Sequence, residues 1–162
     1  MKMKTKIFSA MITIFLFAAV TQAQDYKTAI GLRLGYPLSI SYKTFISEKG
    51  ALEGVAGFRS FSGYSWFNIG GYYQHHTEIP SVDGLKWYYG GGANVYFWSY
   101  DSGFAGSGST SIGLSGVLGL DYKFSDIPLN ISVDWIPTFF VNGFGNGFAG
   151  GYGALAGRYT IK

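Results

Sequence analysis

The chain has two histidines, His75 and His76, beside Thr77 and Glu78, and these residue types can bind metals or transfer protons. Adjacent residues on a strand point to opposite faces, so both imidazole rings can join one site only where the strand ends. His76 and Glu78 share a side and Asp83 follows in the next loop, but the spacing matches no recognised zinc motif. We therefore predict no catalytic and no metal site here, and interpret the pair as a solvated strand terminus.

A second chemical motif lies at residues 145–150, Gly-Asn-Gly-Phe-Ala-Gly, which matches the dinucleotide-binding fingerprint letter by letter. The fingerprint binds a pyrophosphate when it joins a strand to a helix in a βαβ unit, and the sequence has no helical period in this region. Glycines of a flexible loop explain the match better, and no cofactor is predicted.

Along most of the chain, apolar and polar residues alternate with a period of two. Between residues 111 and 124 the apolar side chains share one parity, while serines and charges share the other. The apolar set is Ile112, Leu114, Leu118, Leu120, Tyr122 and Phe124, and the polar set is Ser111, Ser115, Asp121 and Lys123. This alternation is typical of a strand with one apolar and one polar face.

The same alternation recurs along most of the chain. It predicts eight strands, at residues 28–35, 38–46, 51–61, 66–76, 85–98, 111–124, 129–141 and 151–162. Each is near the roughly nine to eleven residues that a tilted strand needs to cross a bilayer. The sequence therefore predicts an all-β protein, an eight-stranded antiparallel up-and-down transmembrane β-barrel.

Residues 1–23 form a separate N-terminal unit. Three lysines precede an apolar stretch at residues 7–20, and small Ala23 follows. The stretch is shorter than the roughly 20 residues of a spanning helix, which disfavours an uncleaved anchor. We expect a signal peptide that is cleaved after Ala23 and a barrel domain at residues 24–162.

The charge balance excludes one class of partner. Three of the 12 basic residues lie in the leader, which leaves nine basic and nine acidic residues and a formal charge of zero. No basic surface remains to follow a phosphate backbone, so nucleic acid is not an expected partner. Aromatic residues make up 19% of the chain and charged residues 13%, which is the reverse of a disordered composition.

Most charges after the leader fall mid-strand on the polar parity. A membrane barrel turns its apolar parity to lipid and its polar parity to the lumen, and small residues such as Gly31, Ser41 and Gly90 on that parity suit a narrow interior. We expect a lumen charge network of Arg33, Lys43, Glu53, Arg59, Asp121, Lys123, Asp134 and Arg158. In this orientation Leu120→Arg should impair insertion, whereas inward-facing Gly119→Ser should be tolerated.

A soluble barrel of the lipocalin type is an alternative interpretation of the same pattern. In that case the charged parity would face water, and the aromatic parity would line a ligand cavity. The small residues of the polar parity and the aromatic residues near strand ends favour the membrane barrel.

Residues 126–135, Asp-Ile-Pro-Leu-Asn-Ile-Ser-Val-Asp-Trp, read as a tight turn that leads into a late strand, and residues 151–162 close the chain with alternating apolar side chains. In these stretches, and in its architecture after the leader, the chain resembles the small eight-stranded outer-membrane β-barrel proteins of Gram-negative bacteria. The resemblance implies location in the cell outer membrane, contact with its lipid and lipopolysaccharide, and handling by the barrel assembly machinery during biogenesis. Many relatives end on an aromatic residue, whereas this chain ends on Lys162.

The resemblance also implies that both termini face the periplasm. The connections at residues 36–37, 62–65, 99–110 and 142–150 then lie outside the cell. The two long connections are Gly-rich and carry the candidate contacts for an unidentified surface ligand, Tyr100, Phe104, Phe144 and Phe148.

We therefore expect a non-enzymatic outer-membrane protein with a structural or surface-interaction role. An eight-stranded interior is just wide enough for side chains, so an open pore is not expected. The enzymatic alternative is a lipid A acyltransferase or deacylase, because some barrels of this size have such activities. Its nucleophile would be Ser99, Ser102, Ser107 or Ser109, whereas both histidines lie at the opposite, periplasmic end.

Overall fold

The computed structural model describes residues 26–100, 109–143 and 147–162, so the expected leader lies outside the described part of the chain. The described residues form strands and turns, and they include no helix that is long and apolar enough to span a membrane. The strands are β1 (Thr28–Tyr36), β2 (Leu38–Phe45), β3 (Gly50–Phe61), β4 (Tyr64–Glu78), β5 (Leu85–Tyr100), β6 (Ser109–Lys123), β7 (Leu129–Trp135), β8 (Thr138–Phe140), β9 (Gly147–Ala149) and β10 (Gly153–Ile161).

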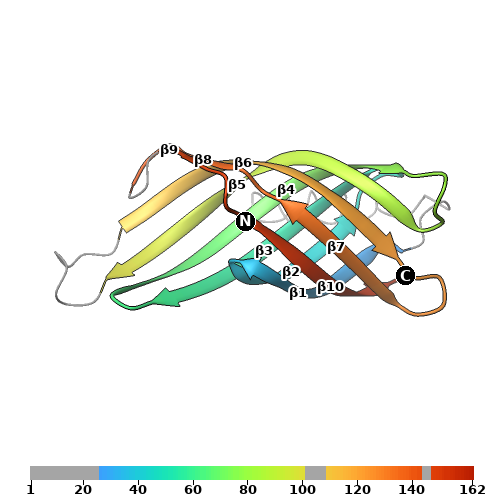
Figure 1. The fold of residues 1–162 in the computed structure, drawn as a ribbon, viewed down its shortest axis with the longest axis horizontal. Coiled ribbons are helices and arrows are strands. Elements are labelled where there is room, and N and C mark those ends of the chain that lie inside the picture. Colours follow the sequence, from blue (N-terminus) through green and yellow to red (C-terminus); the bar gives the residue numbers. More distant parts are fainter. Residues whose placement is uncertain (1–25, 101–108, 144–146) are drawn as a thin grey trace, which may run out of the picture.

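All ten strands belong to one antiparallel sheet that closes on itself (Figure 1). Strands adjacent in sequence pair from β1 to β7, and β10 closes the ring by pairing with β7 on one side and β1 on the other. β7 and β8 are two parts of one wall strand, and β9 and β10 are two parts of the next. The barrel is therefore eight-stranded and up-and-down, which confirms the predicted fold class.

The seventh and eighth wall strands are interrupted side by side, which the sequence did not predict. Pro137 has no N–H to donate to a ladder, although its carbonyl accepts a hydrogen bond from Gly116 N at 2.9 Å. Between the paired segments, residues 136–137 face residues 150–152, so the eighth wall strand carries one extra residue, as in a β-bulge. The expected unbroken strand at 129–141 and the expected loop at 142–150 are therefore wrong in part, because β9 pairs with β8.

The barrel has two chemically distinct ends. We call the end that contains the turns at residues 46–49, 79–84 and 124–128 and the C-terminus the terminal end, which lies at the right of Figure 1. The opposite, loop end contains the β1–β2 and β3–β4 turns and the connections from β5 to β6 and from β8 to β9. The Tyr36–Pro37 peptide bond at the loop end is cis, and Gly63 supplies the positive φ of 94° in the β3–β4 turn.

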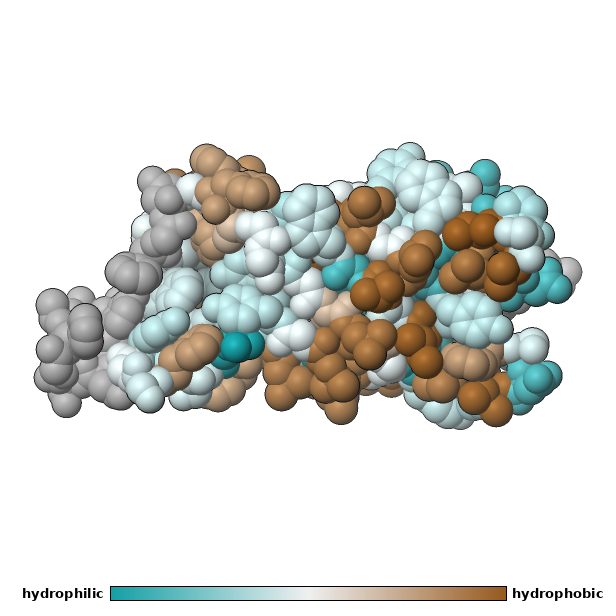
Figure 2. Space-filling view, viewed as in Figure 1, coloured by the Kyte–Doolittle hydropathy of each residue, from teal (hydrophilic) through white to brown (hydrophobic). Residues whose placement is uncertain are grey.

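The outer wall is apolar. In β10 burial alternates residue by residue, and large side chains of the predicted apolar parity are exposed, such as Leu32 at 56%, Ile40 at 59% and Leu155 at 52%. Figure 2 shows apolar residues, in brown, spread over the side of the barrel and hydrophilic residues, in teal, gathered at the terminal end. The wall therefore presents to its surroundings the side chains that a soluble protein would bury.

The lumen is tightly packed around Gly119. A Cβ at Gly119 would lie 2.6 Å from Tyr88 Cζ and 2.6 Å from the Val133 carbonyl oxygen. The expectation that Gly119→Ser is tolerated much better than Leu120→Arg stays a prediction, but the packing leaves no free space for a serine side chain at this position. Parity places Gly119 on the inner face correctly, but the room there is already taken by the ring of Tyr88.

Candidate functional site: the lumen and the loop end

Six charged side chains meet inside the barrel, each from an inward-facing strand position. They are Arg33, Lys43, Glu53, Asp121, Asp134 and Arg158, from β1, β2, β3, β6, β7 and β10, and all six are buried. Three are cations and three are carboxylates, so the cluster is formally neutral. We call these six residues the lumen charge cluster.

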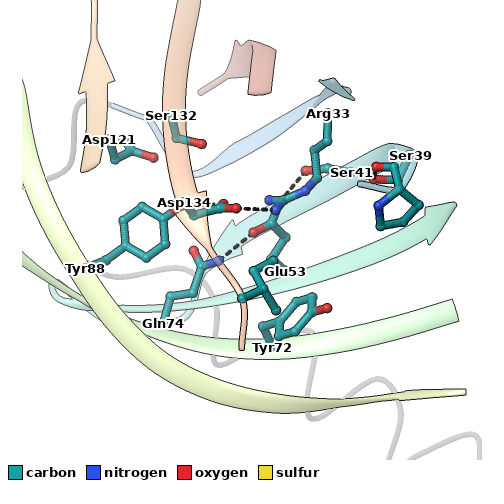
Figure 3. Close-up of polar contacts among 12 residues, drawn as sticks. Arg33, Ser39, Ser41, Glu53, Tyr72, Gln74, Tyr88, Asp121, Ser132 and Asp134 are labelled. Carbon is teal, nitrogen blue, oxygen red and sulfur yellow. Dashed lines mark hydrogen bonds and ion pairs between the residues drawn. The ribbon is translucent and has the colours of Figure 1, made fainter. Parts of the chain in front are cut away.

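Glu53 is the centre of the lumen charge cluster (Figure 3). Its Oε1 accepts hydrogen bonds from Arg33 at 2.9 Å, from Arg158 at 2.5 Å and from the Ser41 hydroxyl at 2.7 Å. Its Oε2 accepts one from Gln74 Nε2 at 2.5 Å. A carboxylate that is this fully partnered can remain charged in a lumen from which bulk water is excluded.

The carboxylates of Asp134 and Asp121 pair with the remaining positive charges of the cluster. Arg33 also donates to Asp134 Oδ1 at 2.7 Å, and the Tyr88 hydroxyl donates to Asp134 Oδ2 at 2.7 Å. Lys43 Nζ donates to Asp121 Oδ2 at 2.9 Å. Because every carboxylate in the cluster accepts bonds from a cation, the strands that supply them are tied across the lumen.

Two residues expected in the network lie elsewhere. The Arg59 guanidinium carbon lies 4.1 Å from the ring centroid of Tyr36 and 4.6 Å from that of Phe61, near the loop end. Lys123 donates to the carbonyls of Phe124 and Ile127 and so stabilises the β6–β7 turn at the terminal end. Parity predicts the face of a strand residue but not its depth, and both residues lie near strand ends.

A mostly aromatic cluster extends through the lumen from Tyr88, which contacts the charges, toward the loop end, and sequence reasoning missed it. Its buried members are Val55, Trp66, Tyr72, Tyr88, Tyr96, Val117, Ile136, Phe140 and Tyr152. The ring centroids of Trp66 and Tyr96 lie 5.2 Å apart, and those of Tyr96 and Phe140 lie 5.1 Å apart. The signal was present, because Trp66 and Tyr72 share a parity with Asn68 and Gln74 along β4.

A small cavity lies between Arg33 and part of the aromatic cluster. It has a volume of about 20 Å³, and Arg33, Tyr36, Asn68 and Tyr96 are among the residues that line it. The buried Asn68 Oδ1 has no hydrogen-bond partner in the protein, and a space of this size holds about one water molecule. This cavity is too small for a solute larger than water.

The interpretation of the histidine pair as a solvated strand terminus is wrong for His76. This side chain is 2% exposed, its ring centroid lies 4.9 Å from each of the rings of Phe45 and Tyr88, and neither ring nitrogen has a hydrogen-bond partner in the protein. His75 points to the other face, where its ring lies 5.5 Å from Tyr89. Among the described residues, no group of three or more acidic or histidine side chains has a geometry that would hold a metal ion.

The candidate surface contacts are only partly described. Phe104 and Phe144 lie outside the described residues, and Tyr100 is the last residue of β5, where its backbone pairs with Tyr64. Phe148, in β9, is 71% exposed. Of the four candidates, Phe148 is therefore the one whose ring the structure places at the surface of the loop end.

The comparisons with known proteins give a likeness of fold. No protein-family model and no curated protein matches this chain. The crystal structure of neisserial surface protein A (NspA) has a similar fold, with a TM-score of 0.56 over 83% of this chain and 93% of that chain. The two sequences are 16% identical, so the likeness concerns the fold alone.

Proposed function

We propose that this chain is a non-enzymatic integral outer-membrane β-barrel protein with a structural or surface-interaction role. The observation that carries the proposal is the inverted distribution of polarity, with paired charges in the lumen and exposed apolar side chains on the wall. A closed barrel satisfies all its ladder hydrogen bonds, as a membrane requires. The fold shared with NspA and the leader expected from the sequence both support export to the outer membrane.

The soluble, lipocalin-like alternative requires the opposite arrangement. A ligand-binding soluble barrel has an apolar interior with free space, whereas this lumen holds the charge cluster, an aromatic cluster and a cavity of only about 20 Å³. Its charged parity would have to face water, but Arg158 and Glu53 are fully buried. No observation favours this alternative.

The enzymatic alternative lacks a histidine base near Ser99, a candidate nucleophile that the structure describes, whereas Ser102 and Ser107 lie outside the described residues. Ser99 pairs with Ser65 at the loop end, whereas His76 pairs with Tyr88 near the terminal end of the same two strands. At about 3.3 Å per residue these positions are roughly 35 Å apart along β4. His76 is also enclosed by aromatic rings, so it cannot reach a substrate in either leaflet.

The proposed partners follow from the outer wall and the loop end. Membrane lipid and lipopolysaccharide would cover the apolar wall, and the barrel assembly machinery would insert the chain. The lumen charge cluster would occlude the interior, so the proposal includes no open pore. A surface ligand, if one exists, would contact the loop end through exposed side chains such as Phe148.

Fractionation combined with gel mobility tests the proposal. Membranes of expressing cells are washed with carbonate and separated on a density gradient, and the outer-membrane fraction is run with and without boiling. We expect the protein in that fraction with a heat-dependent change in mobility, because a folded barrel resists the detergent. Recovery as a soluble periplasmic protein with no such change would contradict the proposal.

A further inference from the structure

Arg59 is the one arginine that the lumen charge cluster does not use. The chain has three arginines, and Arg33 and Arg158 each contact a carboxylate at 2.9 Å or less. Within the described part of the chain, no carboxylate lies within ion-pair distance of Arg59. Within the residues that the structure describes, its planar guanidinium therefore has N–H donors that no carboxylate uses.

Aromatic rings hold this guanidinium in place. It packs over Tyr36 and Phe61, with the guanidinium carbon 4.1 Å and 4.6 Å from the two ring centroids. Tyr36 is in turn packed on Trp66, 5.9 Å away, and Phe61 is stacked on Tyr64, 5.1 Å away. A guanidinium packed against aromatic rings keeps the planar fork of N–H groups that can make bidentate contacts with an oxyanion.

The barrel wall is open beside Arg59. The β2–β3 ladder ends at the pair Leu38 and Phe58, so residues 59–61 pair with β4 alone. Across the short β1–β2 turn, β9 pairs with β8 alone. Arg59 follows the last β2–β3 pair, and its side chain is half-buried, so part of it is accessible near the loop end.

Arg59 lies apart from the other charged residues that the structure describes. The other charged residues of the described chain lie either in the lumen cluster or at the terminal end. The terminal-end set is Lys27, Glu48, Lys49, Glu78, Asp83, Lys86, Lys123, Asp126 and Lys162. Among the described residues, Arg59 is thus the single charge at the loop end, and Asp101, which follows Tyr100 in the sequence, lies outside them.

We propose that Arg59, held by Tyr36 and Phe61, is a binding site for a phosphate or carboxylate group at the loop end of the barrel. The group belongs either to a soluble molecule or to an anionic lipid headgroup, since both present the same oxygen atoms to the guanidinium. This site goes beyond the proposed structural role, and only its lipid form rests on that role.

Arginine side-chain NMR tests the site directly, because only Arg33, Arg59 and Arg158 give Nε–H signals. The refolded barrel is placed in phosphatidylcholine nanodiscs and titrated with inorganic phosphate, and a second sample contains added lipopolysaccharide in the disc. We expect the Arg59 signal to shift saturably, with half-saturation near or below about 1 mM phosphate, while the two lumen signals stay fixed. A shift with free phosphate indicates a soluble oxyanion, and a shift only with lipopolysaccharide indicates a lipid headgroup.

Two variants separate recognition by the guanidinium from simple attraction of charge. Arg59→Lys keeps the charge but loses the planar fork, and Phe61→Leu removes one neighbouring ring, so each should weaken binding about tenfold or more. Binding to the variants is followed through the ring signals of Tyr36, which contacts position 59, because the lysine variant has no Arg59 Nε–H signal. An Arg59 signal that stays fixed in both samples, or a lysine variant that binds as tightly as the parent, would overturn the inference. Unchanged Arg33 and Arg158 signals show that the barrel is folded, so a failure of this site is distinguishable from a failure of the barrel proposal.

Discussion

Glu53→Gln removes the negative charge that Arg33 and Arg158 share. The substitution keeps the shape of the side chain, so it leaves no cavity. Arg33 retains Asp134 at 2.7 Å, but Arg158 loses its carboxylate partner and keeps only neutral acceptors. Both Glu53 oxygens accept hydrogen bonds, from Arg33, Arg158, Ser41 and Gln74. The amide N–H₂ of glutamine replaces one of these oxygens, so a donor then faces another donor and the hydrogen bond is lost.

The expected loss is about 3–5 kcal/mol in the free energy of unfolding, the range for breaking a buried ion pair by removing one partner. It is large because the Glu53 and Arg158 side chains are both fully buried, so water cannot replace the missing contact. The two hydrogen bonds from arginine alone are worth about 1.5–3 kcal/mol each, which sets a similar scale.

Reversible urea unfolding in phospholipid vesicles, followed by tryptophan fluorescence, measures this loss. Lys86→Gln is the matched control, because its 3.7 Å pair with the exposed Glu78 should contribute about 1 kcal/mol or less. A double-mutant cycle with Arg158→Gln should give non-additivity above about 1 kcal/mol. If Glu53→Gln lies within about 0.5 kcal/mol of the parent, the lumen charges do not stabilise the barrel as argued.

Leu120→Arg, on the exposed wall, should lower the stability of the inserted state by about 2–4 kcal/mol, and a normal folded fraction by gel mobility would contradict the assigned lipid face. Gly90→Ala should strongly impair folding, because its Cβ would collide with the Tyr73 carbonyl. Gly54→Ala has open space around its Cβ, so its unfolding free energy should stay within about 0.5 kcal/mol of that of the parent. Unfolding in vesicles compares the two variants, and equal effects would refute the packing argument. His76→Phe should raise the unfolding free energy by about 1 kcal/mol, because it removes two buried nitrogens without hydrogen-bond partners from between two aromatic rings. A decrease of similar size in the unfolding free energy, measured in the same assay, would refute this explanation.

The period of two was sufficient to predict the barrel and its strand faces. It works because each strand is long and its two faces meet different environments, so Leu32 and Arg33 differ sharply in exposure. The interruption at Pro137 was not predicted, because a bulge of one residue depends on pairing with a neighbouring strand.

Pairing inside the lumen could be predicted less well than the faces. The sequence indicates that Glu53 and Arg158 point inward, but their contact across the barrel depends on strand stagger and tilt. The same limit explains His76, whose depth in the lumen decides its burial, and Arg59, which lies beyond the last β2–β3 pair. Strand parity resolves the two faces of the wall, whereas position along the barrel axis is set by the whole sheet.

In the proposed membrane setting, the uneven distribution of the described charges between the two ends favours one direction of insertion. Moving a charged side chain across the hydrocarbon core costs about 2.5–3.5 kcal/mol, and the turns at Tyr36–Pro37 and Ser62–Gly63 carry no charge. These hairpin tips can therefore cross the membrane at little electrostatic cost, while the charged turns of the terminal end resist translocation. The chain would thus enter with its loop end leading and stop with Lys162 on the side from which it came, whatever residue ends the last strand.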